Sequence, residues 1–219
     1  MGNAGIQRSD ALTAGPDGFE STFTVNVLAN HLLVRMLEDV FAPQARIVIT
    51  VSDTHFGDFR HNLGMVPGPA WHHPTDLART GAFPAADTAA AGRTAYSTSK
   101  LAAIYLVHEY ARRLRTGIDI VSYNPGFVPG TDLARDADVV SRLAVRHVLP
   151  IMTLTPLATS RKTVGRHLAD VVLGTTRAPT GAYVDRTIVR PSSAESYDPQ
   201  REAEIWSTAE RIIEPYINQ

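Results

Sequence analysis

The pattern of apolar positions along the chain predicts alternating strands and helices. Residues 45–52 form a nearly continuous β-branched run of strand length, as expected for a parallel strand that is covered on both faces. A second such run covers 118–123, and between the two a helical pattern extends from Tyr96 to about Leu114, with Gly117 just beyond it. Strand, helix and strand in this order predict a βαβ unit in a parallel sheet with a right-handed crossover.

Further periodic segments predict three more helices and a last strand. The helices are expected over 22–40, 155–173 and 198–213, the last with Asp198 as its N-cap and Pro199 in its first turn. Residues 181–184 suggest the strand. The apolar positions expected to be buried are Phe23, Val27, Leu28, Leu32, Leu33, Leu37, Leu101, Ile104, Val107, Leu114, Leu157, Val164, Leu168 and Val172.

Residues 55–93 are broken by repeated glycine and proline and are expected to be irregular. So long an irregular stretch in a compact domain is usually a functional loop or lid. We expect one domain over 1–219, with 132–174 as a segment on the substrate side.

Composition narrows the classes of partner. The chain has 219 residues, 44% of them hydrophobic, and its 21 basic and 22 acidic residues are mixed throughout, so no basic stripe points to nucleic acid or to a membrane surface. The absence of cysteine excludes disulfides and cysteine-based metal sites or nucleophiles, and it permits a cytoplasmic protein. The longest apolar-leaning run, 148–154, is too short to span a membrane. The eight histidines show no metal-ligand spacing, so we expect solvated loop histidines and no metal.

Tyr96 and Lys100 form the most informative local pair. Only two lysines occur in the chain, and Lys100 lies four residues, about one helical turn, after a tyrosine. A cation on the same helix face favours the phenolate, so we expect it to lower the pKa of Tyr96 and make this side chain a usable proton donor. Ser52 and the Pro125-Gly126 turn follow the two strands, and ligands of parallel sheets bind beyond the carboxyl ends of strands.

Five motifs occur in one order on suitable elements, and together they resemble the short-chain dehydrogenase/reductase family. The likeness extends to about Thr131, and the C-terminal helix pattern is similar to that of retinol-dehydrogenase-like and protochlorophyllide-reductase-like members. The motifs are Asn3-Ala4-Gly5, Asn26 within a helix, Ser52 after a strand, Tyr96-x-x-x-Lys100 and Asn124-Pro125-Gly126.

The resemblance implies an α/β fold and a set of roles. The fold would be the C-terminal portion of a Rossmann-type doubly wound parallel sheet, with the first strands and the glycine-rich turn absent. The enzyme would interconvert a carbonyl and an alcohol with NAD or NADP and would form a homo-oligomer. The apolar 148–157 segment and the 55–93 loop suggest a lipophilic substrate.

The residue roles also follow from the resemblance. Tyr96 would be the general acid/base, Lys100 would tune it and bind the nicotinamide ribose, and Ser52 would hydrogen-bond the substrate oxygen. Asn26 would kink its helix and hold a proton-relay water. The remaining cofactor contacts would come from Asn3, Ala4, Gly5, Pro125, Gly126, Val128 and Thr131, the last of them displaced by one position because Pro129-Gly130 intervenes.

The front of the chain departs from the family pattern. Family members place a glycine-rich phosphate-binding turn upstream of Asn-Ala-Gly, whereas the printed sequence contains no Gly-x-x-x-Gly-x-Gly turn and opens at that motif. We therefore expect a fragment or a wrongly assigned start.

Two other functions are open beside the oxidoreductase. One is a non-enzymatic remnant that cannot hold a dinucleotide and acts at most as a binding or interaction module. The other, a serine hydrolase using Ser52 and His55, is disfavoured because Val51-Ser52-Asp53 lacks the Gly-x-Ser-x-Gly pattern of α/β hydrolases.

Overall fold

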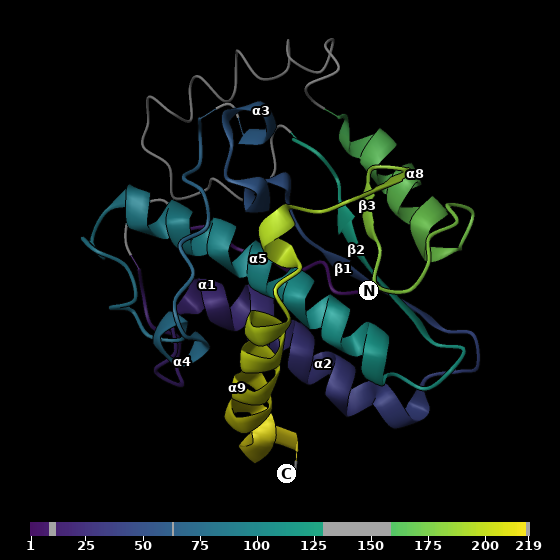
Figure 1. Ribbon diagram of the computed structural model, residues 1–219, viewed down its shortest axis with the longest axis horizontal. Coiled ribbons are helices and arrows are strands. Elements are labelled where there is room, and N and C mark those ends of the chain that lie inside the picture. Colours follow the sequence, from purple (N-terminus) through teal and green to yellow (C-terminus); the bar gives the residue numbers. More distant parts are fainter. Residues whose placement is uncertain (9–11, 63, 129–158, 218–219) are drawn as a thin grey trace.

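A four-stranded sheet with helices on both faces organises this computed structural model (Figure 1). The structure describes residues 1–8, 12–62, 64–128 and 159–217. In the sheet order β1-β2-β3-β4, the first three strands are parallel and β4 runs antiparallel to β3. The strands are β1 (Arg46–Thr50), β2 (Asp119–Asn124), β3 (Tyr183–Asp185) and β4 (Ile188–Arg190). The predicted βαβ unit and fold class are confirmed, while β4 was not predicted.

The first residues of the chain lie beside β1. The backbone N–H of Gly2 donates to the carbonyl of Val48 at 2.8 Å, and the N–H of Thr50 donates to the carbonyl of Gly2, also at 2.8 Å. This pairing is parallel, and it brings residues 3–6 to the carboxyl end of β1.

One face of the sheet carries most of the helices. A continuous helical run over 21–40 confirms the predicted helix 22–40, and α5 and α9 complete this layer (Figure 1). Its parts are α1 (Ser21–Phe23), the π-helical turn η1 (Thr24–Leu28), α2 (Ala29–Leu37), the 3₁₀ turn η2 (Glu38–Val40), α5 (Ala89–Arg113) and α9 (Pro199–Ile217). The opposite face is covered by α8 (Arg161–Val172).

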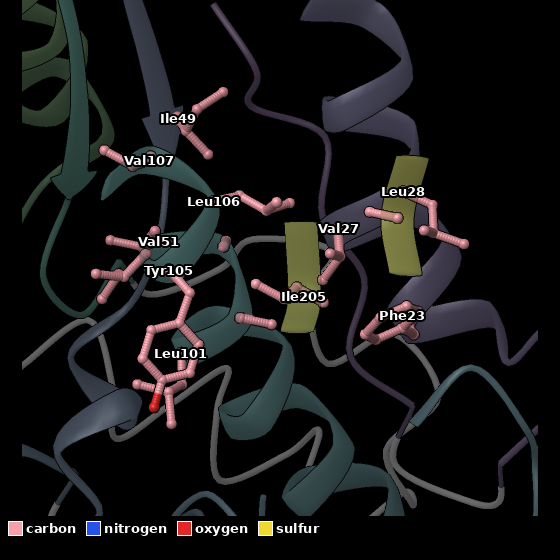
Figure 2. Packing of buried hydrophobic residues seen from close by; sticks show 14 of the residues in the cluster. Phe23, Val27, Leu28, Ile49, Val51, Leu101, Tyr105, Leu106, Val107 and Ile205 are labelled. Carbon is pink, nitrogen blue, oxygen red and sulfur yellow. The ribbon is translucent and has the colours of Figure 1, made fainter. Parts of the chain in front are cut away.

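The alternation of side chains along β1 separates two apolar layers. Ile47 and Ile49 belong to the larger cluster, together with residues of α5 and α9 such as Leu101 and Ile205 (Figure 2). Val48 points to the other face, where it packs with Val171 of α8. Both faces of the strand are therefore buried, which is why its sequence is nearly apolar throughout.

Helix α5 is buried on almost its whole circumference. Between Ala95 and Tyr110 every residue is buried, polar ones included, so the helix is less amphipathic than expected. The reason is α9, which packs across α5 and hides the face that the sequence would leave to solvent (Figure 1).

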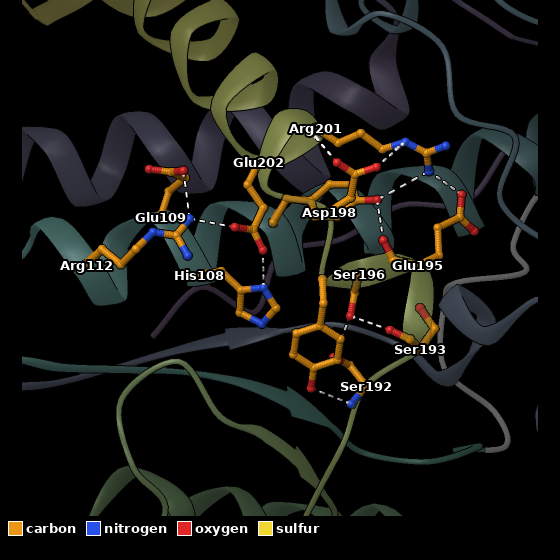
Figure 3. Close-up of polar contacts among 12 residues, drawn as sticks. His108, Glu109, Arg112, Ser192, Ser193, Glu195, Ser196, Asp198, Arg201 and Glu202 are labelled. Atoms are coloured by element: carbon orange, nitrogen blue, oxygen red, sulfur yellow. Dashed lines mark hydrogen bonds and ion pairs between the residues drawn. The ribbon is translucent and has the colours of Figure 1, made fainter.

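A polar network joins α5 to α9 (Figure 3). Glu202 accepts from Arg112 at 2.6 Å, and its other carboxylate oxygen lies 2.7 Å from His108 Nδ1. Arg112 also pairs with Glu109 at 2.7 Å. Asp198 caps α9 as predicted, accepting from the N–H of Gln200 at 3.0 Å.

Several element boundaries differ from expectation. Helix α5 begins at Ala89, capped by Thr88, so Tyr96 lies two turns inside the helix and the irregular stretch ends before residue 93. That stretch also contains short helical turns: η3 (Asp53–Phe56), α3 (Phe59–Asn62) and α4 (Pro74–Leu77). A further short turn, η5 (Ala194–Ser196), precedes α9.

Two apolar positions expected to be buried are exposed instead. Leu33 and Leu37 are 46% and 39% exposed, because the buried side of α2 carries Asn30, His31 and Val34 instead. Residues 129–158, which hold most of the expected substrate-side segment, lie outside the described residues. No helix in the described ranges is long and apolar enough to cross a bilayer.

Candidate active site

Tyr96 and Lys100 lie one turn apart in the buried middle of α5. Their side chains are almost fully enclosed, at 6% and 3% exposure. The Lys100 Nζ lies 5.6 Å from the centre of the Tyr96 ring and donates to the carbonyl of Thr50, the last residue of β1, at 3.0 Å. This hydrogen bond fixes the ammonium at the carboxyl end of the strand.

Burial dominates the acid–base properties of the pair. It raises the pKa of Tyr96 to about 12, against a smaller lowering by the Ser52 hydroxyl, and it lowers the pKa of Lys100 to about 8. The expected lowering of the Tyr96 pKa is therefore wrong in sign. The physical reason is that removing the phenolate from water costs more than its polar neighbours return.

Ser52 lies where β1 turns into η3. Its Oγ accepts from the backbone N–H of Thr54 at 3.3 Å, as an N-cap residue does, and donates to Asp53 Oδ1 at 3.4 Å. The hydroxyl also lies close enough to the phenol of Tyr96 to act on its pKa as a hydrogen-bond partner. The structure thus brings Ser52 and Tyr96 together.

Asn26 lies in the π-helical turn η1, an irregularity of the kind that is frequent at functional sites. Its Oδ1 accepts from the N–H of Ile6 at 2.8 Å, and its Nδ2 donates to the Ile6 carbonyl at 3.0 Å and to Ser99 Oγ at 2.9 Å. Its own backbone carbonyl accepts from Asn30 Nδ2 at 3.0 Å. Asn26 therefore links the N-terminal segment to α5.

The N-terminal motif lies against this cluster. A Cβ on Gly5 would come within 3.3 Å of Lys100 Nζ and 3.4 Å of Asn26 Oδ1, so the glycine allows a close approach of the backbone. Asn3 accepts from Thr50 Oγ1 at 2.9 Å, and Ala4 between them is exposed.

The turn after β2 forms the neighbouring part of the edge. Gly126 has a φ of 72°, and its N–H donates to Asn124 Oδ1 at 3.1 Å. A Cβ there would lie 2.8 Å from Arg186 Nε, an atom of a flexible side chain that can move aside, so the left-handed backbone conformation is what favours glycine. Pro125 and Val128 flank this turn, and Thr131 lies outside the described residues.

Sequence reasoning missed four polar residues at the same edge. Tyr183 of β3 hydrogen-bonds the Asn124 side chain. Burial raises the pKa of Tyr183, and the carboxylates of Asp53 and Asp185 raise it further. Arg186 follows Asp185 with a φ of 57° and covers Gly126. For Asp53, Asp185 and Arg186 the signal that could have found them is their place at or just after the carboxyl end of a parallel strand.

His55 does not form a catalytic pair with Ser52. It is fully buried, contrary to the expected solvated loop histidine, and burial lowers its pKa to about 4. Its Nε2 accepts from the N–H of Ser193 at 3.1 Å, so Nδ1 carries the hydrogen and donates to the Ser52 carbonyl at 2.6 Å. Neither nitrogen serves the Ser52 hydroxyl, which rules out the hydrolase arrangement in this structure.

The chain is similar in sequence to known reductases and dehydrogenases. The chain is 28% identical over 216 residues to protochlorophyllide reductase B of Hordeum vulgare, a match that covers 90% of this chain and 53% of that protein. It is 26% identical over 224 residues to human retinol dehydrogenase 13, covering 97% of this chain and 59% of that protein. These relatives are short-chain dehydrogenase/reductases. The predicted resemblance to the protochlorophyllide reductase and retinol dehydrogenase branches is confirmed.

Both matches cover only part of the relative. The chain spans a little over half the length of these two curated relatives. No family model matches the chain. Among solved structures, NADPH-bound carbonyl reductase from chicken fatty liver is 17% identical with a TM-score of 0.47, covering 84% of this chain and 61% of that chain. The two curated relatives are oxidoreductases.

Proposed function

We propose that this chain is an NAD(P)-dependent oxidoreductase that interconverts a carbonyl and an alcohol, with Tyr96 as its general acid/base. The observation that carries the proposal is the meeting of Ser52, Tyr96 and Lys100 at the carboxyl end of β1. Ser52 follows β1, whereas Tyr96 and Lys100 belong to α5, and parallel sheets place their ligands at this edge. Asn26 and Gly5 adjoin them.

The residues present suit the nicotinamide-ribose end of the cofactor. An ammonium has three N–H donors, and within the described part of the chain Lys100 gives one of them to the Thr50 carbonyl. Gly5 keeps the backbone next to Nζ free of a side chain. We assign cofactor contacts to Lys100 and Tyr96, to Asn3, Ala4 and Gly5, and to Pro125, Gly126, Val128 and Thr131.

The chain's own residues would handle the proton of the reaction. A bound reduced nicotinamide supplies the hydride. Tyr96, protonated at neutral pH because burial raises its pKa to about 12, donates its phenolic proton to the substrate oxygen. The Ser52 hydroxyl hydrogen-bonds that oxygen, and Asn26 holds the N-terminal segment against Lys100. Small carbonyl compounds, lipophilic ones first, are the proposed substrates.

Purified protein should bind NADPH or NADH saturably and reduce aldehydes or ketones, followed by loss of absorbance at 340 nm. Replacing Tyr96 by Phe should lower kcat by about 10²–10⁴-fold, the usual contribution of a positioned acid, and should weaken cofactor binding less than loss of the Lys100 ammonium does. Replacing Lys100 by Ala should weaken cofactor binding. The matched control is Tyr216→Phe, in the partly exposed last turn of α9, which should retain activity.

Two outcomes contradict the proposal. Failure of both cofactors to bind at millimolar concentration would favour a non-enzymatic binding module. Turnover that persists in the Tyr96→Phe variant would remove Tyr96 from the chemistry.

A further inference from the structure

A fully buried histidine lies in the turn that follows Ser52. His55 belongs to η3, and its ring is enclosed between aromatic neighbours, with ring centres 4.2 Å from Phe56 and 5.1 Å from Tyr183. A buried imidazole has two polar nitrogens that need partners. What those partners are decides what the residue can do for the site.

Both nitrogens of His55 have partners with a single role. Nε2 accepts from the backbone N–H of Ser193 at 3.1 Å, and Nδ1 donates to the backbone carbonyl of Ser52 at 2.6 Å. A backbone N–H can only donate and a carbonyl can only accept, so the hydrogen of the neutral ring lies on Nδ1. Because burial lowers the pKa of His55 to about 4, the ring is neutral at neutral pH, as these contacts require.

The ring holds the turn at Ser52 more closely than the backbone does. The N–H of His55 lies 3.4 Å from the Ser52 carbonyl, which is long for a backbone hydrogen bond, and a single 3₁₀ turn is weakly held. The ring contact to the same carbonyl is shorter by 0.8 Å. It therefore fixes the peptide after Ser52, and with it the direction in which the hydroxyl leaves the chain. The Thr54 N–H donates to that hydroxyl at 3.3 Å.

The far side of the ring is anchored to α5 through η5. The Ser193 carbonyl accepts from Ser196 Oγ at 2.7 Å (Figure 3), and the Tyr105 hydroxyl of α5 donates to the Glu195 carbonyl at 2.8 Å. Residues 193–196 thus form a spacer between α5 and His55. Since α5 also carries Tyr96, the contacts run from the helix of the proposed acid to the turn of the serine.

We propose that His55 is a positioning residue for the proposed reaction, which sets the place of the Ser52 hydroxyl relative to the Tyr96 phenol by holding the Ser52 carbonyl. The ring itself neither takes nor gives a proton in this role. The inference rests on the proposed function for its catalytic meaning, whereas the placement of Ser52 is a property of the folded chain alone.

Two conservative variants separate the two contacts of the ring. In His55→Asn the amide nitrogen takes the place of Nδ1 and can still donate to Ser52, whereas in His55→Gln the amide oxygen takes the place of Nε2 and can still accept from Ser193. We expect His55→Ala and His55→Gln to lower kcat by about 10–100-fold, with the cofactor Kd within about twofold of the unmodified chain. His55→Asn should restore kcat to within about threefold.

The placement of Ser52 can be read without turnover. The Thr54 amide donates to the Ser52 hydroxyl, so its hydrogen exchange should be about tenfold faster in His55→Gln than in His55→Asn. In the unmodified chain, ¹⁵N NMR of the histidine rings should show His55 with its hydrogen on Nδ1, the resonance being assigned by its loss in His55→Asn. A hydrogen on Nε2 would overturn the proposal even if a variant failed to fold by circular dichroism.

His72→Gln is the matched control, because His72 is exposed and lies outside η3. It should leave kcat and the exchange of Thr54 unchanged. Equal losses of kcat in His55→Asn and His55→Gln, or a larger loss in His55→Asn, would refute the role of His55 and keep the proposed function. The expected exchange pattern in a chain without turnover would refute the proposed function and keep the placement of Ser52 by His55.

Discussion

At the scale of single residues, Lys100 is a buried cation whose charge is destabilised by the loss of water. The residue is only 3% exposed, and the hydrogen bond from its ammonium to the Thr50 carbonyl does not fully replace water, which is why burial lowers the pKa of Lys100 to about 8. A cation held at such a cost is typical of functional positions. The same residue should therefore favour catalysis and oppose stability.

Replacing Lys100 by Met tests that balance. The pKa of Lys100 in the folded chain, about 8, lies below its unfolded value of about 10.4, so the unfolded chain binds this proton more tightly. The free energy of unfolding therefore rises with pH between about 8 and 10.5, as the folded chain loses the buried charge first. Below pH 8 the variant should gain on the order of 2 kcal/mol in the free energy of unfolding, after allowance for the lost hydrogen bond.

The measurement is urea unfolding at pH 6.5 and at pH 9.5. The advantage of the Met variant should shrink at the higher pH. Lys162→Met, which removes the chain's other lysine from the exposed start of α8, should change stability by less than about 0.5 kcal/mol at either pH. A Lys100→Met protein that is less stable at both pH values would show that the cation is not strained.

At the scale of elements, the site depends on how residues 1–8 are held against α5. Asn26 fastens Ile6 from the π-helical turn, and the backbone of Arg8 crosses the first turns of α5 at Gly92. A Cβ on Gly92 would lie 2.3 Å from the Arg8 carbonyl oxygen, a contact with backbone that cannot be relieved by rotating a side chain. The glycine is therefore needed for contact between segment and helix.

Gly92→Ala should destabilise the protein by about 1–3 kcal/mol, because overpacking outweighs the gain of up to about 1 kcal/mol in helix propensity. Hydrogen exchange should show faster exchange at Gly2 and Ile6 in this variant. Gly165→Ala is the matched control: Gly165 lies in α8 with open space where a Cβ would be added, so the same substitution should stabilise the chain by up to about 1 kcal/mol. Equal effects of the two substitutions would contradict the close approach.

At the scale of the whole molecule, α9 closes the core over α5 and α2. Ile205 is fully buried in the larger apolar cluster (Figure 2). Trp206 packs edge-on against His31 and Tyr110, with ring centres 5.2 and 4.9 Å away. The Glu202 network adds polar contacts along the same interface (Figure 3). We therefore expect the C-terminal helix to unfold together with the sheet as one unit.

Ile205→Ala should lower the free energy of unfolding by about 2–5 kcal/mol while leaving a single transition when fluorescence and circular dichroism are compared. The control Leu173→Ala, at a 79% exposed position after α8, should change it by less than about 0.5 kcal/mol. Two separate transitions in Ile205→Ala would show that α9 is not part of one cooperative domain.

Local sequence was sufficient for the framework of the fold. The β-branched run at β1 has apolar side chains on both faces, so both faces of the strand have to be buried. Asp198-Pro199 can begin a helix by local contacts alone. The spacing of Tyr96 and Lys100 fixed their common helix face, because four residues make about one turn. Such features depend on neighbours along the chain.

Tertiary structure decided what local sequence could not. The burial of α5 comes from α9, about ninety residues later, and the exposure of Leu33 and Leu37 from the direction in which α2 packs. The sign of the Tyr96 pKa shift followed from enclosure by several elements rather than from the nearby lysine. Asp53, Asp185 and Arg186 meet at one edge only because three strands end there. Side chains from distant segments set the dielectric surroundings of a site, and a pattern along the chain does not contain that information.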